Sequence, residues 1–196
     1  LHDALSPDHA HAILNKAFAV IEKVQQLMSF HDPQSDLSRL NQYAFDQAVQ
    51  VDPVTYAVLQ RAQRLFYASH GLFDCSIADT LVNWKILPDH LQQDHLDKTS
   101  YSQINLKLLH DHFVQFSQPI LLDLGGIAKG FAVDLAIHCL RQNSIKNAVV
   151  NAGGDLRVLG QITEEIVIRD PQNLQNFHRL GALANGALAT SASYFS

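Results

Sequence analysis

The chain of 196 residues is poor in several residue types, and each shortage excludes a class of protein. It has only two cysteines, Cys75 and Cys139, which lie far apart in the sequence. Cys139 falls on the apolar face of a predicted helix, so a buried free thiol rather than a disulfide is expected there. No apolar run approaches the roughly 20 residues that a membrane span needs. Fourteen Lys and Arg residues against nineteen Asp and Glu give a net charge of -5, which argues against a nucleic-acid partner.

Common site motifs are missing as well. Eleven histidines are present, but the sequence contains no H-E-x-x-H motif and no Cys/His spacing typical of metal ligands. This argues against both a catalytic and a structural zinc site. His110 and His112 are two positions apart, and residues at that spacing do not share a helix face. The sequence as given begins without a basic segment followed by an apolar one, so no signal peptide is expected in it.

The composition that remains is that of a globular protein. Hydrophobic residues make up 47% and charged residues 17% of a chain long enough to bury one good core, which predicts a single domain over residues 1–196. Ser6-Pro7 reads as a helix start, and apolar residues at three- and four-residue steps predict an amphipathic helix as far as Met28. A short helix is predicted over residues 36–44. A longer one is predicted from Asp52-Pro53 to a stop near Gly71, with a stripe of Val54, Val58, Ala62 and Leu65.

The second half of the chain is predicted to be rich in strands. A strand pair is expected over residues 107–118, a strand over 121–124 and a helix over 127–142. Short strands are expected at 148–151, 155–159 and 165–168, with a last pair over 181–190 around an Asn-Gly turn. Helices first, followed by strands around one central helix, predict an α+β fold rather than a doubly wound sheet.

The most informative segment joins the predicted strand at 121–124 to the helix that follows it. A strand, a tight glycine turn and a helix start would point backbone N–H groups at one spot, which binds phosphate. Gly125 and Gly126 carry no Cβ and let a ligand approach the backbone, and Lys129 adds a positive charge. The spelling matches neither G-x-x-x-x-G-K-[ST] nor G-x-G-x-x-G. By spacing alone, a plain strand-to-helix turn explains it equally well.

This segment resembles the central motif of the ApbE family, the flavin transferases that move FMN from FAD onto a protein. Four further stretches follow the order found in that family: residues 28–41, Gly71-Leu72-Phe73-Asp74, residues 151–156, and Ala189-Thr190-Ser191. Together the five stretches cover nearly the whole chain. The resemblance implies an ApbE-like fold, related to the T-fold, that is incomplete at both ends.

The resemblance also implies which residues form the site. The glycine segment would lie against FAD through Gly125, Gly126, Lys129 and Phe131, and the backbone carbonyl of Ala128 would help to hold Mg²⁺. Leu72, Phe73 and Asp74 would lie along the nucleotide. His31 stands where the family often has a Tyr that stacks on the isoalloxazine, and His offers less ring area and a titratable edge. The turn at 153–155 would support the residues of the cofactor site without contacting the cofactor itself.

The function implied by the resemblance is Mg²⁺-dependent transfer of FMN from FAD to a Thr or Ser hydroxyl of an acceptor protein, with release of AMP. No residue is expected to act as the general base, so none is predicted to be catalytic. Ala192 replaces a Gly of the family pattern. The later segments of the family that complete the Mg²⁺ site are not in the sequence. Two alternatives therefore stay open: hydrolysis of FAD to FMN and AMP, and FAD binding without catalysis. Family members are typically exported, which implies a periplasmic or membrane-anchored location outside the inner membrane.

Overall fold

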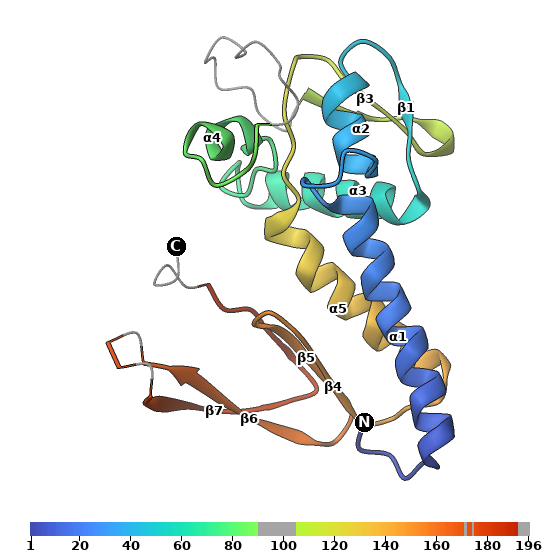
Figure 1. Cartoon of the computed structure of the whole chain (residues 1–196), viewed down its shortest axis with the longest axis vertical. Helices are drawn as coiled ribbons and strands as arrows, with labels where there is room; N and C mark the ends of the chain where they lie inside the picture. Colours follow the sequence, from blue (N-terminus) through green and yellow to red (C-terminus); the bar gives the residue numbers. More distant parts are fainter. Residues whose placement is uncertain (90–104, 171, 174, 192–196) are drawn as a thin grey trace. The chain divides into compact units, whose positions relative to one another are not determined.

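The structure, a computed structural model, describes residues 1–89, 105–170, 172–173 and 175–191, and over these residues the chain forms two compact units. One unit is Lys23–Ala128, and the other combines Leu1–Glu22 with Lys129–Ser196. Helices α1 and α5 each run from one unit into the other (Figure 1). The single domain expected from the chain length stays a prediction.

The helices begin where local capping signals place them. Helix α1 spans Pro7–Met28, α2 Asp36–Tyr43, α3 Pro53–Ala68, α4 Ala78–Asn83 and α5 Gly125–Gln142. The Ser35 side chain accepts a hydrogen bond from the backbone N–H of Ser38, and Asp52 accepts one from Val54. These bonds satisfy N–H groups that the first turn of a helix leaves without partners. The three predicted helices before residue 71 are therefore confirmed.

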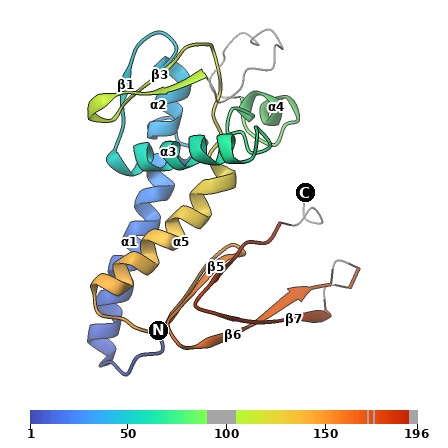
Figure 2. The same cartoon turned by 180° about the vertical axis from the view of Figure 1, so that it is seen from behind.

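The strands form antiparallel pairs in both units, as Figures 1 and 2 show. In Lys23–Ala128, strands β1 (Val49–Gln50), β3 (Phe113–Phe116) and β2 (Leu106–Leu108) make one sheet in that order, with the 3-10 turn η2 (His110–His112) between β2 and β3. In the other unit, β4 (Ala148–Ala152), β5 (Asp155–Leu159) and β8 (Ala187–Leu188) form a sheet, and β6 (Thr163–Arg169) pairs with β7 (Phe177–Ala184). The α+β class is confirmed.

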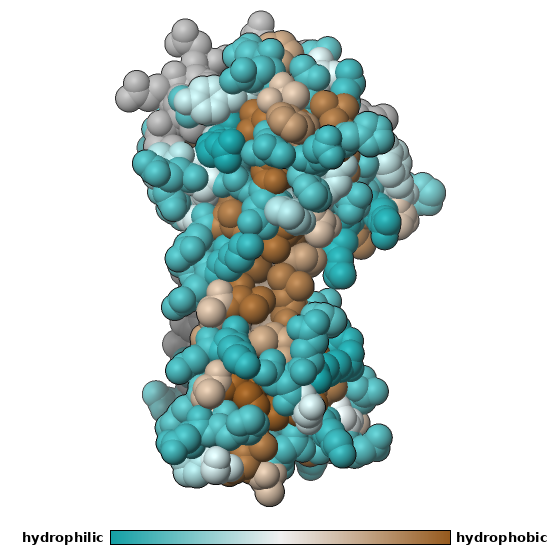
Figure 3. Space-filling view, turned by 90° about the vertical axis from the view of Figure 1, so that its right-hand side faces the viewer, coloured by the Kyte–Doolittle hydropathy of each residue, from teal (hydrophilic) through white to brown (hydrophobic). Residues whose placement is uncertain are grey.

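The core of the second unit lies between the two long helices and the first strands of its sheet. It consists of Ile13, Ala17, Ala136, Ile137, Leu140, Ile145, Ala148 and Leu159, each at most 6% exposed. Polar side chains cover most of the face drawn in Figure 3, and apolar side chains reach the surface in patches between them.

Residues 121–124, predicted as a strand, belong to no strand. The backbone N–H of Leu122 donates to Oδ1 of Asn41 at 2.8 Å, and Nδ2 of Asn41 donates to the Leu122 carbonyl at 2.9 Å. The backbone N–H of Asp123 donates to the carbonyl of Cys75 at 2.8 Å. The segment is wrongly predicted because a side chain and a loop, rather than a neighbouring strand, satisfy its backbone.

Three smaller differences have local causes. Helix α5 begins at Gly125, two residues earlier than predicted, so the glycine pair lies in its first turn. Strands β7 and β8 do not pair with each other, because β7 pairs with β6 and β8 with β5. Leu65 is 45% exposed, since the buried face of α3 consists of Thr55, Val58, Leu59 and Ala62. The departure from the family pattern at Ala192 lies outside the described residues.

Candidate functional site

The start of α5 is the centre of the site. Gly125 and Gly126 are exposed in its first turn. The carboxylate of Asp123 accepts hydrogen bonds from the backbone N–H groups of Gly125 and Leu124 and so caps the helix. A Cβ at Gly125 would lie 3.1 Å from Oδ2 of Asp123. The glycine therefore leaves room for a carboxylate from the chain itself.

Asp123 has an unusual electrostatic environment. Burial raises the pKa of its carboxyl above the ordinary value, and the backbone N–H groups of Gly125 and Leu124 oppose that rise. His31, whose side chain is exposed, also favours the ionised form of Asp123 electrostatically. The turn that carries His31 is therefore close to the start of α5.

Phe73 and Asp74 reach the same place from the loop after α3. A Cβ at Gly126 would lie 3.7 Å from Cε2 of the Phe73 ring, which is ordinary contact distance. Oδ1 of Asp74 accepts hydrogen bonds from the backbone N–H of Ser76 at 2.8 Å and from its hydroxyl at 2.6 Å. Leu72 is 93% exposed, so this loop presents an apolar side chain to solvent directly before Phe73 in the sequence.

Cys75 is a buried thiol near both carboxylates, Asp74 and Asp123. Burial raises the pKa of its thiol to about 12, and the negative charges of Asp123 and Asp74 add to the rise. A thiol with such a pKa is not a nucleophile at neutral pH. The effect of both charges on this thiol shows that Asp74 and Asp123 each lie near the Cys75 side chain.

The structure thus brings together His31, Phe73, Asp74 and the glycine pair, which are separated by up to about a hundred residues in the sequence. Ala128 follows in the first turns of α5 and is half-buried. Lys129 is exposed on the same helix, whereas Phe131 is only 5% exposed. Asp123 was not singled out from the sequence. An acidic residue two positions before a helix start is the signal that points to it.

A second group of residues gathers in the other unit around the turn between β4 and β5. Oδ1 of Asn151 accepts a hydrogen bond from the backbone N–H of Gly154 at 3.1 Å, and the Thr190 hydroxyl donates to the Gly154 carbonyl at 3.3 Å. Gly154 has a φ of +96°, which favours glycine. A Cβ at Gly130 would lie 3.6 Å from Oδ2 of Asp155. Residues from three of the five motif stretches, Gly130, 151–155 and Thr190, therefore lie together in this unit.

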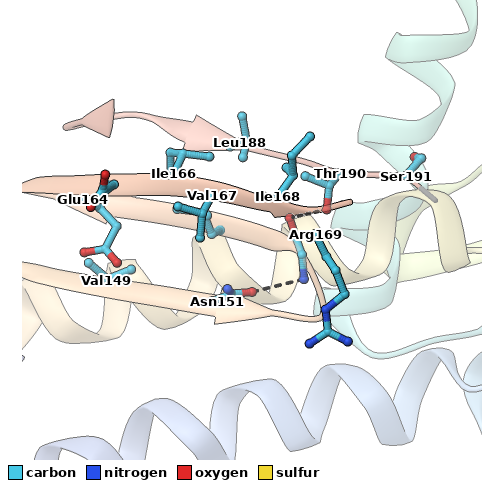
Figure 4. A pocket seen from close by; sticks show the side chains of 13 residues that line it. Val149, Asn151, Glu164, Ile166, Val167, Ile168, Arg169, Leu188, Thr190 and Ser191 are labelled. Carbon is cyan, nitrogen blue, oxygen red and sulfur yellow. Dashed lines mark hydrogen bonds between the residues drawn. The ribbon is translucent and has the colours of Figure 1, made fainter. Parts of the chain in front are cut away.

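A cavity of about 640 Å³ opens beside this turn (Figure 4). Its polar side chains include Asn151, Arg169 and Thr190, and its apolar lining includes Val149 and Leu188. Six successive residues of β6, from 164 to 169, border the cavity. Successive side chains of a strand alternate between its faces, so an edge of β6 also faces the cavity.

The described residues contain no group of three or more His, Cys, Asp or Glu side chains that could hold a metal ion. Among the described helices, none combines the length and the apolar character that crossing a membrane requires.

Comparisons with known proteins agree on one family. The model of the ApbE family matches residues 3–196. The FAD:protein FMN transferase of Treponema pallidum is 32% identical over 164 residues, which cover 76% of this chain and 45% of that protein. The FAD:protein FMN transferase of Rhodobacter capsulatus is 30% identical over 162 residues, or 77% of this chain and 31% of the other. The chain thus spans less than half the length of these two curated relatives.

Solved structures give the same fold. The flavin transferase ApbE from Vibrio cholerae superimposes with a TM-score of 0.78 at 24% identity and covers 99% of this chain and 66% of its own. The ApbE protein of Thermotoga maritima gives a TM-score of 0.78 at 24% identity over 94% of this chain and 63% of its own. The ApbE-like fold expected from the sequence is confirmed.

Proposed function

The chain belongs to the ApbE family, and from this premise we propose that it carries the flavin-nucleotide site of an FAD:protein FMN transferase. The reaction moves the FMN part of FAD to a Thr or Ser hydroxyl of an acceptor protein and releases AMP. The observation that carries the proposal is the meeting of His31, Phe73 and Asp74 with the glycine pair at the start of α5.

The pyrophosphate of FAD would lie beside Gly126 and Lys129. Asp123 already accepts the N–H groups of Leu124 and Gly125, so these two donors are engaged. The exposed backbone at Gly126 and the positive end of the α5 dipole remain accessible to an anion. Lys129, less than one helical turn further along, adds a positive charge. A bound anion close to Asp123 would also favour the protonated form of that carboxyl.

The flavin and ribose parts would extend over the loop of residues 72–74 and His31. Leu72 and Phe73 offer apolar surface, and the imidazole of His31 can stack on a ring. Asp74 can accept a hydrogen bond from a ribose hydroxyl or a ring N–H. Because Phe131 is 5% exposed, we propose that it contributes by packing α5 in place rather than by touching the nucleotide.

In the transfer, the acceptor hydroxyl oxygen bonds to the FMN-side phosphorus and the bond from that phosphorus to the AMP oxygen breaks. The hydroxyl proton passes to water, and AMP departs with the electron pair of the broken bond. The residues of this chain bind and orient FAD for that step, and none of them is assigned as the general base. Mg²⁺, held in part by the Ala128 carbonyl, would supply charge neutralisation when bound.

Titration of FAD against the chain, followed by flavin fluorescence with Mg²⁺ present, tests the proposal. We expect saturable quenching by the wild-type chain. Gly126→Asp should weaken binding about tenfold or more, because a carboxylate beside the pyrophosphate repels it while suiting a helix N-terminus. His9→Asp, which places the same charge in the exposed first turn of α1, is the matched control and should stay within about twofold. Absence of quenching by the wild type would overturn the proposal.

Product analysis separates the possible activities. AMP together with a covalently yellow acceptor peptide containing Thr or Ser indicates transfer. AMP and free FMN without labelled peptide indicate hydrolysis of FAD, and binding without AMP indicates a flavin-binding module. Family membership is also our ground for proposing that the whole protein works on the outer side of the inner membrane, a location that fractionation with a periplasmic marker would check.

A further inference from the structure

One side chain holds the segment that leads into α5. The amide of Asn41, on α2, both donates to the Leu122 carbonyl and accepts from the Leu122 N–H, at 2.9 and 2.8 Å. Neighbouring strands in a sheet exchange the same pair of bonds. On the far side, the Asp123 N–H donates to the Cys75 carbonyl at 2.8 Å. The segment is thus fixed between α2 and the loop after Phe73.

This contact is deeply buried. Asn41 is 5% exposed, and Leu122 and Leu124 are not exposed at all. Water is therefore a poor substitute for either bond, and a buried carbonyl or N–H that loses its partner bears the full cost of desolvation. Any replacement of Asn41 that lacks a donor or an acceptor has to move residues 121–124 or leave a polar group unsatisfied.

Helix α2 fixes the turn of His31 as well. The Ser35 hydroxyl at its N-cap donates to the Ser29 carbonyl at 2.7 Å, and the Ser29 hydroxyl accepts from the His31 N–H at 3.2 Å. The carboxylate of Asp36 in turn accepts from the Asp52 N–H at 2.7 Å and from the Thr55 hydroxyl at 2.9 Å, which ties α2 to α3. One short helix therefore holds both the His31 turn and the stretch before the glycine pair.

We propose that Asn41 is a positioning residue for the flavin-nucleotide site: its amide fixes residues 122–126, and with them Asp123 and Gly126, in register with His31. This inference rests on the proposed function, because the site that it positions is the one assigned to FAD. It gives the S-D-L-S-R-L-N stretch a role that local helix capping does not explain, since Asn41 contacts a segment 81 residues further along the chain.

Three variants test it. Asn41→Leu removes both bonds, and Asn41→Asp keeps the acceptor but loses the donor. Val114→Ala serves as the matched control, because it opens a cavity at a side chain of β3 that is fully buried in the same unit. We expect Asn41→Leu to raise the Kd for FAD about tenfold or more, and Val114→Ala to leave it within about twofold, at a temperature where circular dichroism shows all variants folded.

The pH dependence of Asn41→Asp gives a readout that lost packing cannot mimic. The new carboxylate cannot donate to the Leu122 carbonyl at pH 8, but at pH 5 its protonated form carries an O–H that can. We expect the Kd ratio of this variant to the wild type to fall from about tenfold towards unity between these pH values, and the ratio for Asn41→Leu to stay constant. The charged groups at this place, His31 and Asp74 near the segment and Asp123 within it, are the same in wild type and variants, so the ratio compares chains with these groups in common.

Hydrogen exchange separates this inference from the proposed function. If the wild type binds no FAD, the proposed function fails, and the backbone amides of residues 122–126 then decide the role of Asn41. Faster exchange there in Asn41→Leu than in Val114→Ala supports the positioning role. Equal exchange in the two variants, or FAD binding that responds equally to both, overturns it.

Discussion

At the scale of single residues, Asp123 is a carboxylate that the fold keeps partly out of water. Burial raises its pKa, while the N–H groups of Gly125 and Leu124 and the charge of His31 pull in the other direction. A carboxyl whose pKa is higher in the folded than in the unfolded chain favours folding fully below its unfolded pKa. That contribution is lost as the pH rises through the folded pKa.

Asp123→Asn should therefore change stability in a pH-dependent way. The amide oxygen can still accept an N–H of the α5 start, but the side chain no longer ionises. We expect the melting temperature of the variant, relative to wild type, to increase between pH 4 and pH 7, because only the wild type acquires a buried charge over that range. Melting curves at several pH values measure this difference, and a constant difference would contradict the expectation.

At the scale of elements, the helix starts could be predicted because their signals are local. Ser35 and Asp52 cap α2 and α3 through bonds to residues two or three positions ahead. The segment 121–124 could not be predicted in the same way, because the partner of Leu122 lies 81 residues away. The sequence also could not show that β8 pairs with β5, since the Asn185-Gly186 turn fits a hairpin equally well.

In the site as well, some features could be predicted from local sequence signals and others depend on contacts between distant residues. That Gly125 and Gly126 lie at a helix start follows from the spacing of apolar residues, but the approach of His31 and Phe73 was implied only by family resemblance. Asp123 was missed although it is part of the motif, because its importance comes from burial and from its neighbours Cys75 and Asp74. Neither the burial of a side chain nor the identity of its spatial neighbours can be read from a sequence before the fold is known.

Asp52, the N-cap of α3, contributes to stability in a way that depends on pH. Burial of Asp52 raises its pKa, but the Val54 N–H, Lys23 and His112 lower it further, so the net pKa is below the ordinary value. Asp52→Ala should cost about 1 kcal/mol at pH 7, and Asp52→Ser, which keeps a cap, should cost less. The difference between wild type and Asp52→Ala should shrink as the pH falls through the lowered pKa. Urea unfolding at pH 7 and at pH 3 measures both effects.

Glycines in the turns of the second unit differ in their tolerance of a side chain. Gly160 has a φ of +91°, and a Cβ there would lie 2.0 Å from the backbone carbonyl oxygen of Lys146. Gly153 has a φ of +61° with no heavy atom within 4 Å of its Cβ position. We expect Gly153→Ala to cost about 1 kcal/mol through its backbone conformation alone, and Gly160→Ala to cost clearly more. Similar unfolding midpoints for the two variants would contradict this.

At the scale of the whole molecule, packing and hydrogen bonds hold the described chain together without covalent cross-links. Neither Cys75 nor Cys139 forms a disulfide, and the first is buried and the second half-buried. Reducing agent should therefore leave the melting temperature unchanged. A thiol reagent such as DTNB should label Cys139 first in the native protein, because burial raises the pKa of the Cys75 thiol to about 12. Equal labelling of both thiols, checked by mass spectrometry, would contradict this.

The edge of β6 that faces the cavity has a consequence for how copies of the chain behave in solution. Within the part of the chain that the structure describes, β6 pairs only with β7, and Val167 on it is 52% exposed. A strand edge without a partner is a template for pairing between molecules. We expect the average mass in light scattering to rise with protein concentration and Val167→Lys to suppress that rise. The strand that borders the cavity would then also set the concentration up to which the chain remains monomeric.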